Sequence, residues 1–409
     1  MHLSTYFKKL GPGPIIAAAF IGPGTVTVCT LAGVNFGFSL LWAIVLSIIL
    51  TVILQELSGR IGLVTRQDLS QLIRDQKGNS GLRILSMFFV VLAIGMGNAA
   101  YESGNISGAN MGLQLFWEAP IYQSGRFELH SGNLLLGLIT LGILWIGSYQ
   151  KLEKVLVSLV VCMSIAFVAT AILTKPDWNS VLRGFKPSWN LEHLSTLVAL
   201  IGTTVVPYNL FLYASLAKSN WNDPSDIKWM RRDIILSIVL GGVVSMAILM
   251  VGAANSSTEI VNAVDVSRGL ESIFGAYAKY LMGFGLLAAG LTSSLTAPLA
   301  GGLVVCGILG WDQSIRSRSM RISMGVIVSL GLIFSSFGIK PVQLIILAQL
   351  ANGIILPIIS GWIIWIAGKA ELLGSYRNNS FNTAVAAVLW LFTLALGLKS
   401  IFTVLSIDV

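Results

Sequence analysis

Two short stretches of this sequence decide its fold: Ile21-Gly22-Pro23-Gly24-Thr25 and Gly202-Thr203-Thr204-Val205-Val206-Pro207-Tyr208-Asn209. Each of them interrupts a long apolar run. A proline removes a backbone donor and clashes with the preceding helical turn, and glycine permits non-helical dihedral angles, so both stretches predict broken helices. Inside a bilayer, the backbone groups that a break frees are tolerated only where they line a cavity or pack against protein. The two stretches therefore predict a binding site between two discontinuous membrane helices.

The composition places these breaks in a membrane. Of the 409 residues, 55% are hydrophobic and 11% are charged, and the mean hydropathy is +0.81. A soluble domain carries about 25% charged residues, so this composition excludes a soluble enzyme, a nucleic-acid-binding protein and a disordered chain. The net charge of +8 comes from basic residues in short loops, a pattern typical of membrane topology signals.

The sequence contains no motif for a resident cofactor or metal. It has neither a phosphate-binding loop nor a dinucleotide fingerprint, so we expect no cofactor and no ATP-driven pump. The cysteines Cys29, Cys162 and Cys306 each lie inside an apolar run, without the spacing of a disulfide framework or a metal site. Because no nucleophile–base pair lies within the apolar runs, we expect a protein that is not an enzyme.

The apolar runs predict an all-α integral membrane protein with eleven transmembrane helices. A run of about 18 apolar residues is long enough to cross a bilayer. The spans lie near residues 11–34, 38–58, 83–117, 132–149, 152–174, 194–217, 233–254, 280–311, 322–338, 341–367 and 381–404. Loops are short, so we expect one transporter domain over residues 1–409.

The breaks fall in spans 1 and 6. These spans correspond if the chain consists of two inverted five-helix repeats, about 11–174 and 194–367, followed by an extra helix, about 381–404. A matching pair of interrupted helices indicates the binding site of an inverted-repeat transporter. Most Lys and Arg residues lie in loops on the side of the N-terminus, which predicts a cytoplasmic N-terminus and an external C-terminus. We expect a multi-pass protein of the plasma (inner) membrane.

Several stretches resemble the Nramp family of divalent-metal transporters. They are Gly11-Pro12-Gly13, Gly22-Pro23-Gly24-Thr25, Gly33, Gly37, Leu40-Leu41-Trp42, Gln55-Glu56-Leu57, Arg60-Ile61-Gly62 and Asp68-Leu69, and then 202–219, 290–301 and 348–357. The resemblance covers most of the chain. It implies a LeuT-type fold with discontinuous helices 1 and 6 and transport by alternating access.

The metal-binding residues of the family are mostly replaced here. The family motif Asp-Pro-Gly-Asn in the first span reads Gly22-Pro23-Gly24-Thr25, which removes the carboxylate and the carboxamide. In the sixth span, Val206 stands where the family has a methionine, and Tyr208 and Tyr213 stand where it has histidines. Of the family's metal site, only Gln349 and the backbone carbonyls near the breaks remain.

The substrate site that we predict from these breaks contains hydroxyls and amides and no formal charge. A divalent cation at mid-membrane needs compensating negative charge. Helix N-termini after each break favour an anionic group, and hydroxyls and amides both donate and accept hydrogen bonds. We therefore expect a small anion or neutral polar solute, such as bicarbonate. The residues of the predicted site are Gly22, Gly24, Thr25, Thr203, Thr204, Val206, Tyr208, Asn209 and Gln349.

Two alternatives stay open for the function. One is a divalent cation, Mg²⁺ or Mn²⁺, because Mg²⁺ retains several waters that hydroxyls and carbonyls could hold. The other is a membrane sensor on the same scaffold that does not transport. Apart from the substrate and the lipid bilayer, we expect a coupling ion, H⁺ or Na⁺, and no nucleic acid as partners.

Glu102 is a carboxylate deep in an apolar span, and such residues commonly relay protons or ions. The resemblance implies the same role, because Glu102 and Asn105 match positions that the family uses for proton movement. Tyr213, at a family histidine position, completes the predicted relay. The structural alternative for Glu102 is a hydrogen bond to a neighbouring polar group.

Overall fold

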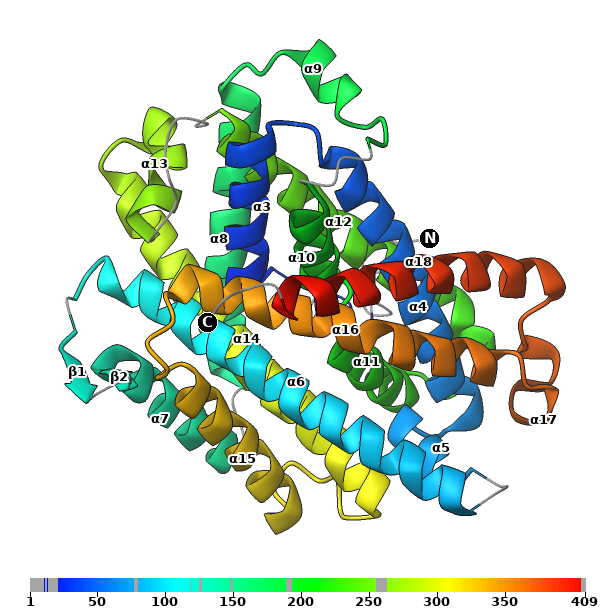
Figure 1. The fold of residues 1–409 in the computed structure, drawn as a ribbon. Helices are drawn as coiled ribbons and strands as arrows, with labels where there is room; N and C mark the ends of the chain where they lie inside the picture. Colours follow the sequence, from blue (N-terminus) through cyan, green and yellow to red (C-terminus); the bar gives the residue numbers. More distant parts are fainter. Residues whose placement is uncertain are drawn as a thin grey trace.

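The computed structural model describes residues 11, 13, 21–76, 80–117, 119–124, 127–147, 150–188, 193–254 and 263–405. The long apolar runs form helices that pack side by side, with one two-stranded antiparallel hairpin at the end of α6 (Figure 1). The elements are α3 (Pro23–Phe36), α4 (Leu41–Thr65), α5 (Leu69–Arg74), α6 (Ser80–Gln114), β1 (Ile121–Ser124), β2 (Phe127–His130), α7 (Ser131–Ile146), α8 (Gln150–Leu173), α9 (Trp178–Arg183), α10 (Leu194–Thr204), α11 (Pro207–Asn220), η2 (Pro224–Asp226), α12 (Ile227–Ala253), α13 (Ala263–Phe274), α14 (Tyr277–Leu309), α15 (Arg318–Phe334), α16 (Pro341–Ala367), α17 (Ala370–Leu373), η3 (Gly374–Tyr376) and α18 (Ser380–Leu405).

The helices agree with the predicted spans. Within the described residues, 8 candidate spans are long and apolar enough to cross a membrane, with α10 and α11 counted as one. The other predicted spans correspond to α3, α7 and α15, which are shorter helices of 14, 16 and 17 residues. Residues 12 and 14–20 of the predicted first span, and the tail at 1–10, lie outside the described residues.

Two predicted spans were shorter than the observed helices because each helix continues past the charged residues that limited the prediction, whether these are exposed, as on α12, or buried, as Arg60 is on α4. The seventh span was expected from 233, but α12 begins at Ile227, after a turn whose N-cap is Asp223. Arg231 and Arg232 are exposed, whereas Asp233 is buried within the helix. The second span was expected to end at 58, but α4 continues to Thr65.

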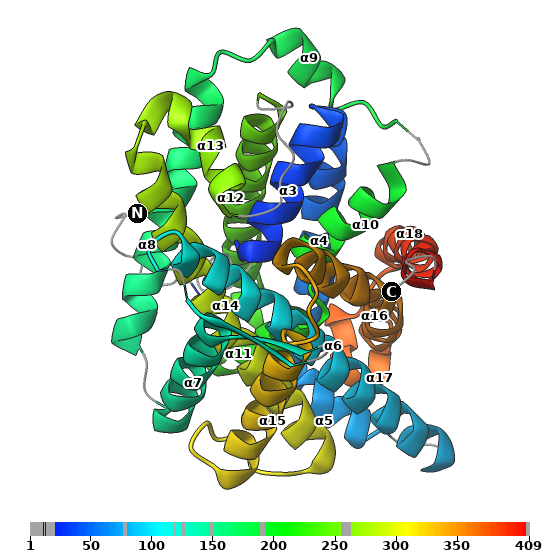
Figure 2. The ribbon, with the colours of Figure 1, turned by 60° about the vertical axis from the view of Figure 1, so that its left-hand side comes forward.

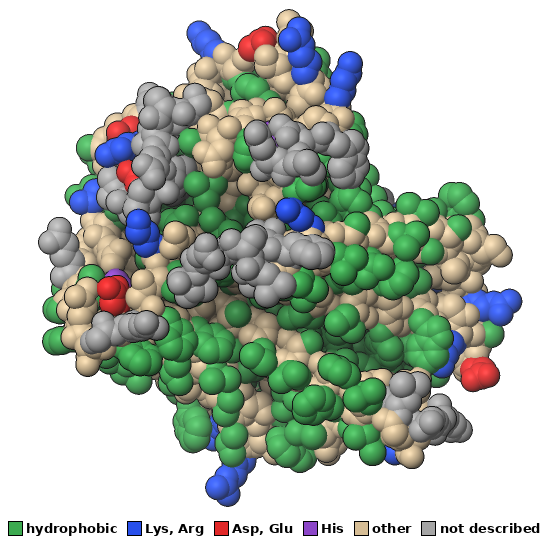
Figure 3. Space-filling model, in the orientation of Figure 1, with side chains coloured by type: hydrophobic (Ala, Val, Ile, Leu, Met, Phe, Trp, Pro, Cys, Tyr) green, Lys and Arg blue, Asp and Glu red, His purple; other side chains and the backbone are tan. Residues whose placement is uncertain are grey.

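The outer surface of the bundle is apolar. On α6, Ile84, Phe88 and Met96 are more than half exposed, and Phe381 and Val388 on α18 are exposed to a similar degree. Figure 3 shows green hydrophobic side chains across the face of α6 and α16, with charged side chains mostly at the edges. In a chain of this composition, such a surface faces lipid.

Helix α6 is the central element of the packing and runs beside α14, α15 and α16 (Figures 1 and 2). Its contact with α14 is close because the facing residues are small. A Cβ added to Gly290 would lie 2.7 Å from the Cα of Ala109, and one added to Gly112 would lie 2.6 Å from the carbonyl oxygen of Gly283. Small residues permit this approach between membrane helices, so α6 is fixed between its neighbours.

Candidate functional site

The break predicted in the sixth span occurs where the sequence places it, and at the first predicted break the described residues show a helix that starts after Gly22. Helix α10 ends at Thr204, Val205 and Val206 are non-helical, and α11 begins at Pro207. Helix α3 begins at Pro23 after Gly22, whose backbone is extended. Proline suits the first helical position because its missing N–H would have no partner there. Each proline therefore starts a new helix at the break.

Gln349 of α16 lies between the two breaks. A Cβ added to Gly24 would lie 2.3 Å from Gln349 Nε2, and one added to Gly202 would lie 2.3 Å from the carbonyl oxygen of Gln349. Asn352, one turn further along α16, donates from Nδ2 to the carbonyl oxygen of Gly202 at 3.3 Å and to Gln349 Oε1 at 3.3 Å. We call Gly24, Gly202, Gln349 and Asn352 the break cluster.

The predicted site residues are buried, and they carry no charge. The hydroxyls of Thr203 and Thr204 both donate to the carbonyl oxygen of Leu200 at 2.9 Å. Their oxygen lone pairs are therefore the groups that they can offer to a ligand. Asn209 Oδ1 has no hydrogen-bond partner among the described residues. The site thus offers mainly oxygen acceptors, supplemented by the amide of Gln349.

Val206 and Tyr208 form the wall of the second break. They belong to a buried cluster with Tyr101 and Ala348, and the rings of Tyr101 and Tyr208 meet edge to face with centroids 5.3 Å apart. Ala348 directly precedes Gln349, so this wall adjoins the break cluster. Where the family has a methionine and a histidine, this wall has a smaller apolar side chain, Val206, and a larger aromatic one, Tyr208.

Two of the predicted relay residues, Glu102 and Asn105, lie on α6. One face of α6 contacts the helices that form the breaks and α16: Gly97 and Gly104 face Ile355 and Ala348 of α16. On the same face, Gly108 lies against Pro23 of α3 and Tyr101 against Tyr208 of α11. Glu102 instead faces α15, where a Cβ added to Gly331 would lie 2.7 Å from Glu102 Cγ. Asn105 Nδ2 donates to Glu102 Oε2 at 3.4 Å. Glu102 and Asn105 therefore contact each other, next to the break cluster and outside it.

Tyr213 does not contact this pair; it belongs to a different set of residues. Its hydroxyl donates to Asp233 Oδ2 at 3.2 Å. The same carboxylate accepts from the backbone N–H of Gly11 at 3.0 Å and of Gly13 at 2.8 Å. We call Gly11, Gly13, Tyr213 and Asp233 the Asp233 cluster. Sequence reasoning missed Asp233 because it was placed at the start of a span, and the basic pair before it was the available signal that the helix had already begun.

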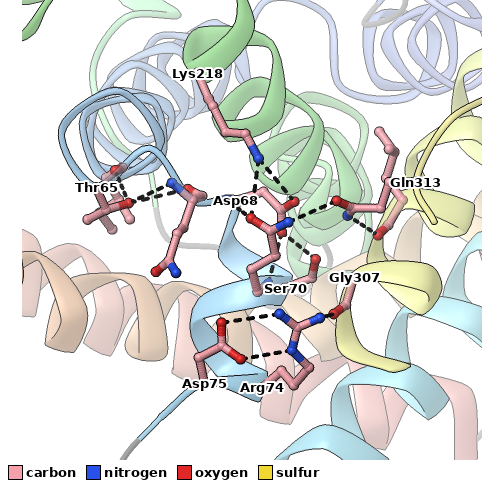
Figure 4. A network of polar contacts seen from close by, with 12 residues as sticks. Thr65, Asp68, Ser70, Arg74, Asp75, Lys218, Gly307 and Gln313 are labelled. Atoms are coloured by element: carbon pink, nitrogen blue, oxygen red, sulfur yellow. Dashed lines mark hydrogen bonds and ion pairs between the residues drawn. The ribbon is translucent and has the colours of Figure 1, made fainter. Parts of the chain in front are cut away.

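A polar network connects the far end of α11 to α5 and α14 (Figure 4). Asp68 caps α5 by accepting from the N–H of Gln71 at 2.9 Å. Lys218 Nζ lies 4.0 Å from Asp68 Oδ2 and donates to Gln71 Oε1 at 3.2 Å. Gln71 donates in turn to Gln313, and Arg74 donates to the carbonyl oxygen of Gly307. We call this set the α5 network, and it joins α5 to α11 and α14.

The break cluster can bind either sign of charge in principle. Backbone carbonyls at the end of α10 are partly negative, and the N-termini of α3 and α11 are partly positive. Among the described residues, no group of three or more His, Cys, Asp and Glu side chains could hold a metal ion. A cation would therefore be held by neutral oxygens, whereas an anion would meet helix N-termini and an amide.

Comparisons with known proteins identify one family. The family model described as "Natural resistance-associated macrophage protein-like" (Nramp) matches residues 13–403. The chain is 28% identical to the divalent metal cation transporter MntH of Ralstonia nicotianae, over 93% of this chain and 88% of that protein. It is 26% identical to the MntH of Mycobacterium tuberculosis, over 98% of this chain and 92% of that protein.

Solved structures show the same fold. The Eremococcus coleocola manganese transporter, in complex with an aromatic bis-isothiourea substituted compound, superimposes with a TM-score of 0.81 at 20% identity, over 98% of this chain and 88% of that one. MhsT in complex with L-phenylalanine superimposes with a TM-score of 0.64 at 17% identity, over 94% and 98% of the two chains. At these identities the likeness shows the fold, which is of the LeuT type.

Proposed function

Since this chain belongs to the Nramp family, as its match over residues 13–403 shows, we propose that it transports a divalent metal cation by alternating access. The observation that carries the proposal is the pairing of both helix breaks on Gln349 of α16. Curated relatives named as divalent metal cation transporters support a cation better than the small anion that we expected from the residue exchanges.

We propose Mg²⁺ as the cation, bound with part of its hydration shell. The proposed site offers neutral oxygens and no negative charge, so it can replace only a few of the waters bound to the cation. These oxygens belong to Thr25, Thr203, Thr204, Asn209 and Gln349. Mg²⁺ dehydrates reluctantly and commonly keeps several waters in proteins, so it fits such a site better than Mn²⁺ does. The loss of the methionine supports this choice, because a soft thioether favours transition metals.

A small anion such as bicarbonate is the second candidate. It is favoured by the absence of a carboxylate from Gly22 and by the N-termini of α3 and α11 beside the breaks. Glu102, with Asn105, is the proposed relay for a coupling proton in either case. We keep Tyr213 as a proposed relay residue through its contact with Asp233.

The test is uptake into proteoliposomes that contain the purified protein, with separate arms for Mg²⁺, Mn²⁺ and bicarbonate. Internal metal-sensing and pH-sensing dyes report each substrate. Uptake of Mg²⁺ above empty vesicles supports the proposal, and bicarbonate uptake without metal uptake overturns it in favour of the second candidate. Folded protein that moves none of the three supports a sensor that does not transport.

The variant Gly22→Asp restores a carboxylate at the first break, and Gly22→Asn is its uncharged control. A cation substrate predicts stronger metal uptake for Gly22→Asp than for Gly22→Asn, because the added charge compensates a cation at mid-membrane. An anion substrate predicts the reverse order. Equal uptake by both variants contradicts our placement of the site.

The chain is a multi-pass membrane protein, and we propose that its N-terminus is cytoplasmic and its C-terminus external. The distribution of Lys and Arg residues supports this orientation. We also propose that the domain consists of two inverted repeats, about 11–174 and 194–367, with α18 as the extra helix. The paired breaks in the first helix of each repeat support that division.

A further inference from the structure

A pocket of about 340 Å³ lies between α4, α12 and the start of α18, away from the helix breaks. Its polar part contains Glu56 and Arg60 of α4, Arg231 of α12, and Asn378 and Asn382 at the start of α18. The remaining wall is apolar. A pocket with this mixed lining, at the end of membrane helices, suits a ligand with a polar head and an apolar tail.

The charges of the pocket favour an anion. Arg60 Nε and Arg231 Nη2 lie 3.2 and 2.9 Å from the same oxygen, Glu56 Oε1. Two guanidinium groups thus share one carboxylate, which leaves one positive charge. Arg60 is further held by the carbonyl oxygen of Tyr376 at 2.6 Å and by Asn378 Oδ1 at 2.5 Å, whereas the side chain of Arg231 is 51% exposed. Arg231 is therefore the cation that can reach a ligand.

A second observation points to the same ligand. Asn378 is only 6% exposed, and within the described part of the chain no group accepts a hydrogen bond from its Nδ2. A buried amide donor without an acceptor is costly, by about 1–3 kcal/mol, unless a ligand or water completes it. Asn378 Oδ1 is already used by Arg60, so the free donor remains for an acceptor in the pocket.

The apolar wall opens toward the lipid-facing surface. It includes Ile235 of α12, which is 47% exposed, and Phe381 of α18, which is 74% exposed. A free anion in water gains nothing from these side chains, whereas a lipid chain buries against them. Basic pockets between membrane helices are known to bind anionic lipid head groups.

We propose that this pocket binds the phosphodiester head group of an anionic phospholipid, with Arg231 and Asn378 Nδ2 as donors and the acyl chains against Ile235 and Phe381. The ligand chemistry is a phosphate that carries one negative charge, which matches the single uncompensated positive charge of the pocket. The lipid would bridge α12 and α18, two helices that the sequence places far apart.

The test measures retained lipid on the full-length protein by native mass spectrometry after exchange into defined lipid. The probes are phosphatidylglycerol, phosphatidylcholine with the same acyl chains, and glycerol phosphate without chains. We expect phosphatidylglycerol to be retained about tenfold more than either other probe, because the pocket matches both its charge and its chains. Equal retention of phosphatidylcholine overturns the charge argument, and equal binding of glycerol phosphate overturns the lipid as the source of the phosphate.

Variants localise the site. Arg231→Gln should lower phosphatidylglycerol retention about tenfold, and Asn378→Asp should lower it at least as much, because it keeps the acceptor for Arg60 and replaces the free donor by a carboxylate. Arg232→Gln is the matched control, since it removes the same charge one residue away, where Arg232 stacks on Trp229. Equal losses in Arg231→Gln and Arg232→Gln, or full retention in Asn378→Asp, would show that lipid binds elsewhere. Thermal unfolding of each variant without added lipid confirms that it is folded.

Discussion

The break cluster and the Asp233 cluster both contact the N-terminal part of the chain, the first through a neutral amide and the second through a carboxylate. At the break cluster, Gly24 lies against the neutral amide of Gln349. At the Asp233 cluster, the backbone N–H groups of Gly11 and Gly13 donate to a buried carboxylate. The family's carboxylate is absent from the first break, yet a carboxylate binds the chain that precedes it. A carboxylate is therefore absent from the proposed substrate site and present where it binds the chain that precedes α3.

The largest effect is expected from removing the carboxylate. Asp233→Ala leaves the N–H groups of Gly11 and Gly13 without their acceptor, and each such loss costs roughly 2 kcal/mol. We expect the free energy of unfolding to fall by about 4 kcal/mol, seen as a large drop in the thermal unfolding temperature in detergent. Tyr213→Phe is the control, because it removes only the 3.2 Å hydroxyl contact and should cost about 1 kcal/mol. Similar costs for both variants would mean that the backbone donors contribute little.

A smaller effect is expected at the uncharged cluster. A Cβ at Gly202 would meet the backbone of α16, which cannot give way, whereas a Cβ at Gly24 would meet the end of a flexible side chain. Overpacking costs about 3 kcal/mol in the first case, of which a gain of about 1 kcal/mol in helix propensity offsets part. We expect Gly202→Ala to lose about 2 kcal/mol and Gly24→Ala to be near neutral in thermal unfolding. The reverse order would contradict the close approach of α10 and α16.

A substitution at Glu102 distinguishes a proton-relay role of this residue from a purely structural one. Glu102→Gln keeps the shape of the side chain and replaces a 3.4 Å contact with Asn105, so we expect a stability change below about 1 kcal/mol. If Glu102 relays protons, uptake measured over a range of pH should lose its pH dependence in this variant. Full transport with an unchanged pH profile would leave Glu102 a structural residue. Asn105→Leu is the companion variant, because it removes the partner and retains the carboxylate.

The smallest effect is expected in the α5 network. Lys218 is 30% exposed, and its Nζ lies 4.0 Å from Asp68 Oδ2, a geometry worth about 0.5 kcal/mol or less. Lys218→Met should therefore barely change thermal unfolding. High salt should lower the wild-type stability by a similar small amount and leave the variant unaffected. A loss above about 2 kcal/mol would instead assign the α5 network a role in holding the bundle closed.

The sequence by itself determined the class of protein and the two breaks. Apolar length fixes membrane helices because a bilayer requires about 20 apolar residues. Pro23 and Pro207 favour breaks because proline removes a backbone donor and clashes with the preceding turn, although α14 and α16 continue through Pro298 and Pro357. Both effects are local, so they can be read without the fold. The number of spans and the choice of Gln349 followed from the same patterns together with the family resemblance.

Only the tertiary structure decided which polar groups meet. The contact of Asn352 with Gly202 joins residues that lie 150 positions apart, and Glu102 and Tyr101, adjacent in sequence, face different helices. Asp233 is buried against Gly11, Gly13 and Tyr213, and the pocket between α4, α12 and α18 exists only where these helices converge. Helical periodicity limits the faces that a residue can occupy, but the packing of neighbouring helices selects its partner.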